Sequence, residues 1–121
     1  MDLIKEYIAI AIEFEKLNQA GLSSKKDVKR NNHLADKLRH IAKTIESERP
    51  DKKVDFANLL LHANSTVRGW CAHHMLEVMT FQSEHKISAL QEIAARSSAD
   101  YGEKLWLNQW YNKHPNDKLL V

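Results

Sequence analysis

The sequence has few residues that cross-link a chain or interrupt its helices and strands, with one cysteine, three glycines and two prolines among 121 residues. A single cysteine, Cys71, excludes an internal disulfide and leaves the chain without the several thiolates that structural zinc sites usually use. Few glycines and prolines leave few positions for tight turns. Charged residues interrupt the apolar N-terminal stretch MDLIKEYIAIAIEF, which predicts neither a signal peptide nor a membrane span. We therefore expect a cytoplasmic protein with no membrane partner.

Hydrophobic residues make up 43% of the chain and charged residues 28%, as in ordinary soluble globular proteins. This length predicts one domain over residues 1–121, large enough to bury a core without a metal or a disulfide. The net charge of +2 is uneven, because residues 25–53 hold ten Lys or Arg against five Asp or Glu. A basic stretch of this kind is usually a solvated helix face, but it can also meet phosphates.

Apolar residues recur at intervals of three and four, which predicts an all-α protein. Gly21 is expected to end the first helix and a serine to cap the second. Short connections favour antiparallel neighbours, so we predict about six helices in three antiparallel hairpins. Residues 113–121 are expected to form a frayed tail. The predicted helices run from about 2 to 19, 25 to 48, 52 to 62, Asn64 or Ser65 to 79, Ser83 onward, and Ser97 or Ser98 to 112.

The stretch HANSTVRGWCAHHML, residues 62–76, concentrates three histidines, a cysteine and an arginine. On a helix, Cys71 and His74 share an apolar face, whereas His73 lies on the opposite side with Glu77 one turn later. A helical zinc pair usually has two ligands four residues apart, and only Cys71 and His74, three apart, share a face. Burial would raise the pKa of the Cys71 thiol and make it a poor nucleophile. We therefore predict a core cysteine, a hydrogen-bonded His74 at the core edge, a solvated His73 pairing with Glu77, and no metal.

Residues 56–79 resemble one unit of a HEAT repeat, whose second helix opens with a Val-Arg pair after a short turn. The resemblance places Val67 and Arg68 at these positions. It implies that the arginine bridges adjacent units through carboxylates or carbonyls, and that Cys71 and Ala72 are the small residues that permit close packing. The implied fold is a HEAT-like right-handed stack, although the other two hairpins do not repeat the signature.

A second resemblance extends from about Leu3 to Trp110, through NNHLADKLRHIAKTI, LLLHANSTVRGWCA, ALQEIA and EKLWLNQW. These segments look like a family of small bacterial all-helical proteins catalogued as a domain of unknown function. Members are similar to proteins encoded beside polymorphic and contact-dependent growth inhibition toxins, where small neighbours act as immunity proteins. The resemblance implies an immunity protein that binds and neutralises a cognate bacterial toxin domain.

Aromatic residues gather in the last predicted helix and point in three directions, so one core cannot cover them all. Tyrosine and tryptophan dominate binding hot spots, which favours a protein partner. Two alternatives are that this helix wedges between its neighbours, with DKLLV covering the remainder, or that the chain forms a homodimer rather than a monomer. The predicted partner-binding residues are Trp106, Trp110, Tyr111, Glu84, Glu92, Asp100 and Glu103.

The sequence has no glycine-rich phosphate loop, HExxH helix or nucleophile elbow. We therefore expect a non-catalytic protein-binding module without a cofactor. The alternative is a basic-faced helical adaptor that binds nucleic acid, which is disfavoured because no aromatic or arginine-rich residues are interleaved for base contacts. The basic face would comprise Lys25, Lys26, Lys29, Arg30, Lys37 and Arg39.

Overall fold

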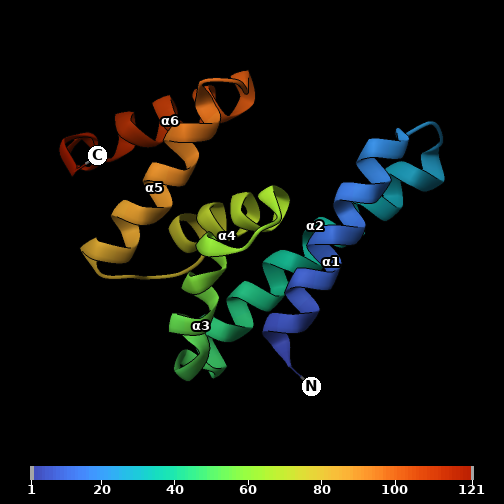
Figure 1. Ribbon diagram of the computed structural model, residues 1–121, viewed down its shortest axis with the longest axis horizontal. Helices are drawn as coiled ribbons and strands as arrows, with labels where there is room; N and C mark the ends of the chain where they lie inside the picture. The colour runs from blue at the N-terminus through green and yellow to red at the C-terminus, as the bar shows by residue number, and fades with distance from the viewer. Residues whose placement is uncertain (1, 121) are drawn as a thin grey trace.

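The computed structural model describes residues 2–120, which form six α-helices and three 3-10 helices and contain no strand (Figure 1). The predicted all-α class is confirmed. The end residues 1 and 121 of the predicted domain lie outside the described residues. The elements are α1 (Leu3–Ala20), α2 (Lys25–Glu48), η1 (Pro50–Lys52), α3 (Lys53–Ala57), η2 (Asn58–Leu61), α4 (Ser65–Glu77), α5 (Ser83–Ser97), α6 (Tyr101–Lys113) and η3 (Pro115–Leu120).

Local capping residues set the ends of the first two helices. The Asp2 carboxylate accepts the backbone N–H of Ile4 at 3.0 Å and thereby caps α1. Gly21 follows α1 with φ of 89°, a conformation that glycine adopts without strain. Ser24 accepts the N–H of Asp27 at 3.1 Å and caps α2. The predicted glycine stop and serine cap are therefore confirmed, and α1 and α2 lie side by side.

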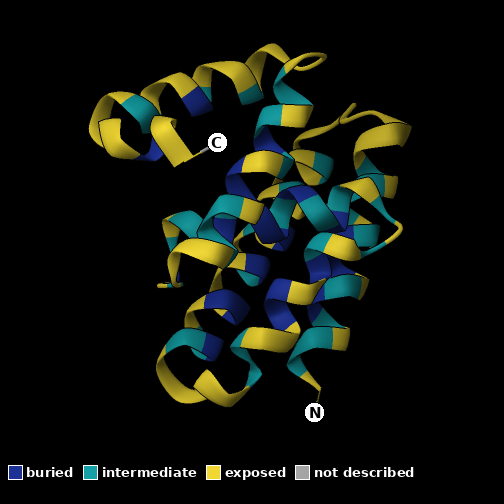
Figure 2. Ribbon diagram, turned by 60° about the vertical axis from the view of Figure 1, so that its left-hand side comes forward, coloured by how far each residue is buried: buried dark blue, intermediate teal, exposed yellow. Residues whose placement is uncertain are grey.

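Helix α4 lies at the centre of the molecule and contacts α1, α2, α3 and α5 (Figure 1). Figure 2 shows buried segments, in dark blue, gathered in the middle of the molecule. Burial around α4 extends to both sides of the helix, because Gly69 is buried as well as Cys71. The largest fully buried side chains of the core are Tyr7, Leu34, Leu38, Ile45, Phe56, Val67, Cys71, Met75, Leu90 and Ile93.

The helix predicted over residues 52–62 is instead divided into η1, α3 and η2. Phe56 of α3 and Leu59 of η2, three residues apart, both enter the core. Leu61 and Val54, both within residues 52–62, remain 85% and 60% exposed. The prediction of one continuous α-helix over residues 52–62 is therefore wrong.

The start of α6 also differs from the prediction, because Asp100 caps it rather than Ser97 or Ser98. The hydroxyls of Ser97 and Ser98 donate to carbonyls of α5, at 2.7 Å and 3.0 Å. Both serine hydroxyls thus bond to the last turn of α5 and do not cap α6. The Asp100 carboxylate accepts the N–H of Glu103 at 3.2 Å.

Residues 115–120, expected within a frayed tail, instead form η3 and are anchored by Asp117, which is only 5% exposed. Asp117 accepts the indole N–H of Trp110 at 2.8 Å and pairs with Lys86 at 2.9 Å. Burial acts to raise the pKa of Asp117, but hydrogen bonds from Lys86 and Trp110 outweigh it and the pKa is lowered. Within the part of the chain described, no helix is long and apolar enough to cross a membrane.

Candidate functional site

A cleft of about 420 Å³ opens where α1, α4, α5 and α6 meet. Its volume falls in the range of roughly 300–1,000 Å³ that is usual for ligand sites. Aromatic and charged side chains share the lining, which suits a ligand or side chain with both polar and flat apolar surface. The lining residues are Phe14, Thr66, Gly69, Trp70, His73, Glu77, Arg96 and Glu103.

The Arg96 guanidinium lies against Gly69 in this cleft. A Cβ on Gly69 would stand 2.8 Å from the Arg96 guanidinium carbon, so glycine provides the space for the arginine. Arg96 donates through Nη1 to the carbonyl and the hydroxyl of Ser65, both at 2.9 Å. Nη1 also lies 3.5 Å from Glu92, and Nε lies 3.4 Å from Glu103. The sequence prediction missed Arg96; the only signal for it was a glycine in the interior of α4.

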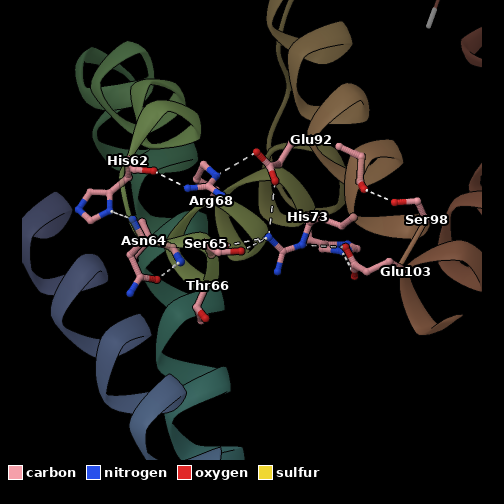
Figure 3. A network of polar contacts seen from close by, with 12 residues as sticks. His62, Asn64, Ser65, Thr66, Arg68, His73, Glu92, Ser98 and Glu103 are labelled. Atoms are coloured by element: carbon pink, nitrogen blue, oxygen red, sulfur yellow. Dashed lines mark hydrogen bonds and ion pairs between the residues drawn. The ribbon is translucent and has the colours of Figure 1, made fainter. Parts of the chain in front are cut away.

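His73 lies in the cleft beside Glu103 and not in open solvent (Figure 3). Its Nε2 is 2.7 Å from Glu103 Oε1, and the two side chains are 16% and 17% exposed. The predicted pairing of His73 with Glu77 is wrong, because α6 covers this face of α4 and supplies Glu103. Glu77 instead accepts the indole N–H of Trp106 at 2.8 Å.

The second carboxylate oxygen of Glu103, Oε2, is buried and accepts no hydrogen bond. The 3.4 Å ion pair with Arg96 contributes charge attraction to this oxygen without hydrogen-bond geometry. A buried acceptor without a donor is destabilising by about 1–3 kcal/mol. The cleft therefore contains one acceptor that an additional donor could satisfy.

Arg68 ties the turn before α4 to α5 (Figure 3). Its Nη1 donates to the carbonyls of His62 and Ala63 at 2.8 Å and 3.1 Å, and its Nε donates to Glu92 at 3.2 Å. The neighbouring Val67 is fully buried, and its N–H donates to Asn64 at 3.0 Å. Arg68, Glu92 and Arg96 thus form a continuous charged network at the edge of the cleft.

Cys71 and His74 lie on the core side of α4. Burial raises the pKa of the Cys71 thiol, which contacts the Phe56 carbonyl at 3.3 Å. Burial also lowers the pKa of His74 to about 3, so the ring is neutral and shares a 2.7 Å hydrogen bond with the Tyr7 hydroxyl. These groups stabilise the core and do not line the cleft.

The predicted partner-binding residues are brought together only in part. Trp106 and Trp110 stack with ring centres 5.3 Å apart, and both are partly buried, as is Tyr111. Glu92 and Glu103 meet at Arg96. Glu84 lies exposed in the first turn of α5, away from them, and Asp100 is engaged as the cap of α6.

The predicted basic face is presented by α2. Lys25, Lys26, Lys29, Arg30 and Arg39 are exposed, whereas Lys37 is half-buried. Arg30 pairs with Glu13 of α1, which neutralises part of the face.

Among residues 2–120, no three His, Cys, Asp or Glu side chains gather in an arrangement that could hold a metal ion. Thr66 is the hydroxyl residue of the cleft lining, and it donates to Glu15 at 2.6 Å. Comparisons of the chain with known protein families, with curated proteins and with solved structures found no match.

Proposed function

We propose that the chain is a non-catalytic protein-binding module, and most specifically an immunity protein that binds and neutralises a cognate bacterial toxin domain in the cytoplasm. The exposed apolar surface of α6 is the observation that carries this proposal. Leu107 is the one residue of α6 that is buried. Tyr101 and Leu105 are 72% and 42% exposed, one turn apart on the same side of the helix. Helix α6 is mostly exposed at the top of Figure 2.

The C-terminal segment leaves this surface available. Asp117 holds η3 beside Trp110, but Leu119 and Leu120 remain 85% and 41% exposed. The exposed apolar side chains of α6 resemble an uncovered protein interface, where aromatic side chains contribute most of the binding energy. Burial of Tyr101 and Leu105 by a partner would remove this surface from water.

We also propose that the helices form three antiparallel hairpins in a HEAT-like right-handed stack. The contacts between α1 and α2, and between α5 and α6, support two of the pairs. The bonds of Arg68 to two carbonyls and to Glu92 support the bridging role that the resemblance implies.

Co-expression of the chain with the toxin domain encoded beside its gene tests the immunity function. Survival of the toxin-producing cells and co-purification of the two proteins are expected. The double substitution Tyr101→Ala with Leu105→Ala should abolish rescue, whereas Lys113→Ala, exposed at the other end of the same helix, should retain it. Failure of both rescue and complex formation by the unaltered chain would contradict the proposal. A homodimer that buries Tyr101, detected by light scattering, would assign the exposed face to self-association instead.

Nucleic acid binding is a second candidate, favoured by the exposure of Lys25, Lys26, Lys29 and Arg39 on α2. An affinity for RNA or DNA that falls steeply with salt is expected if these residues neutralise phosphates. Absence of binding at low salt would exclude this function.

A further inference from the structure

The cleft has an excess of negative charge. Two carboxylates, Glu77 and Glu103, and one guanidinium, Arg96, belong to its lining. The adjoining Glu92 is paired with Arg96 and with Arg68. Three carboxylates thus face two guanidinium groups, so the cluster favours a cation as its occupant.

The unsatisfied Oε2 of Glu103 adds a hydrogen-bond acceptor to this charge. The last torsion of a glutamate side chain is soft, so a donor in the cleft can draw this oxygen toward itself. Glu77 is exposed at the cleft and accepts one indole N–H through Oε1. An occupant with several N–H groups therefore suits the cleft better than an occupant with one.

Aromatic rings form the apolar part of the lining. Phe14 and Trp70 meet edge to face with ring centres 5.0 Å apart, and the lining residue His73 contacts the ring of Trp106, which lies outside the lining, at 4.4 Å. Cations bind over aromatic faces, and tryptophan is the strongest of these. A planar guanidinium both stacks on aromatic rings and binds carboxylates through paired hydrogen bonds, which an ammonium group does not do.

We infer that this cleft binds an arginine side chain presented by a protein partner. The inference rests on the proposed protein-binding function and names the chemical group that the partner contributes. Glu103 lies on the side of α6 that faces α4, whereas Tyr101 and Leu105 lie on the outer side of the same helix. A partner that covers α6 and extends around it can insert one basic side chain between α4 and α6.

A short peptide titration tests the cleft without the partner. The capped tripeptide Gly-Arg-Gly is added to the full chain labelled with ¹⁵N, and the indole N–H signals of its three tryptophans are followed. The signals of Trp70 and Trp106 should shift with a dissociation constant on the order of 1 mM, because one side chain supplies only part of an interface. The signal of Trp110, which is bonded to Asp117, should move least.

Gly-citrulline-Gly is the matched ligand control, since citrulline has the shape of arginine without its charge. It should bind at least about tenfold more weakly, as should the chain variants Glu77→Gln and Glu103→Gln toward the arginine peptide. Glu84→Gln makes the same change in charge at an exposed position of α5 and should leave the affinity unchanged. Circular dichroism verifies that each variant is folded.

Equal binding of the citrulline and arginine peptides, or no shift of Trp70, would overturn the inference. Tighter binding of free arginine than of the capped peptide would also overturn it, because the occupant would then be a small molecule. Protein-partner binding without peptide binding would refute the arginine site alone. Peptide binding without any toxin complex would refute the proposed immunity function but would support the arginine site.

Discussion

The neutral, buried His74 predicts a specific dependence of stability on pH. Its pKa is lowered from 6.5 to about 3, first because burial penalises the imidazolium, and further because of the charges of His73 and Arg39. In the unfolded chain the ring regains its ordinary pKa. The unfolded state therefore binds a proton that the folded state does not bind between these two values. The neutral, buried ring of His74 therefore contributes fully to the free energy of unfolding above pH 6.5. This contribution is lost as the pH falls toward 3.

The magnitude follows from the width of this window. Each pH unit within it removes about 1.4 kcal/mol, so His74 alone accounts for a loss of about 2 kcal/mol between pH 8 and pH 5. Urea unfolding at both pH values measures the free energy of unfolding. The comparison variant is His74→Gln, which keeps a polar side chain beside the Tyr7 hydroxyl but cannot titrate. All other histidines are present in both proteins, so the difference between them reports His74.

The wild-type chain should lose about 2 kcal/mol more than His74→Gln over this interval. His40→Gln is the matched control, because His40 is exposed on α2 and its substitution should leave the wild-type behaviour unchanged. The same loss in wild type and His74→Gln would refute the argument that His74 is buried in its neutral form. A smaller absolute stability of the variant at pH 8 is expected from lost packing and does not enter the comparison.

Three further predictions concern other parts of the fold. Gly69→Ala should lower the free energy of unfolding by about 1 kcal/mol despite the better helix propensity of alanine, because its Cβ would displace the Arg96 guanidinium from its hydrogen bonds to Ser65. Adding Arg96→Ala should recover part of that loss; a stabilised Gly69→Ala protein would contradict the close approach. Asp117→Asn should release η3 and speed its cleavage in limited proteolysis, and unchanged cleavage would show that the Lys86 and Trp110 contacts do not anchor it. Phe56→Ala should cost about 3–5 kcal/mol in urea unfolding, whereas Val54→Ala, 60% exposed, should cost less than about 0.5 kcal/mol; similar losses would contradict the assigned burial.

Helix α6 links the proposed protein-binding function with the proposed arginine site, because it carries the exposed apolar face and also contributes Glu103 to the cleft. Tyr101 and Leu105 form its outer apolar surface, while Glu103 and Trp106 turn toward α4. A partner that covers the outer side of α6 must therefore extend around the helix to reach the negative cluster around Arg96. Electrostatic attraction of a basic partner would act mainly on the rate of association, and burial of the aromatic side chains on the lifetime of the complex.

The sequence by itself determined the helical class and most helix ends. The predicted bounds of the second helix, 25–48, agree with α2 (Lys25–Glu48), since Ser24 and the residues before Pro50 act within a turn of the helix. Periodicity likewise indicated that Cys71 and His74 share the core side of α4, because residues three or four apart on a helix lie on one face.

Only the tertiary structure decided which polar groups meet. His73 and Glu103 are 30 residues apart, and Trp106 is 29 residues from Glu77. Both pairs depend on the direction in which α6 crosses α4, which no local pattern encodes. A helical wheel places His73 opposite the core but does not show whether another helix covers that side. Helix formation depends chiefly on residues that are close along the chain. The charged cleft, in contrast, forms only when α1, α4, α5 and α6 are assembled and bury parts of one another.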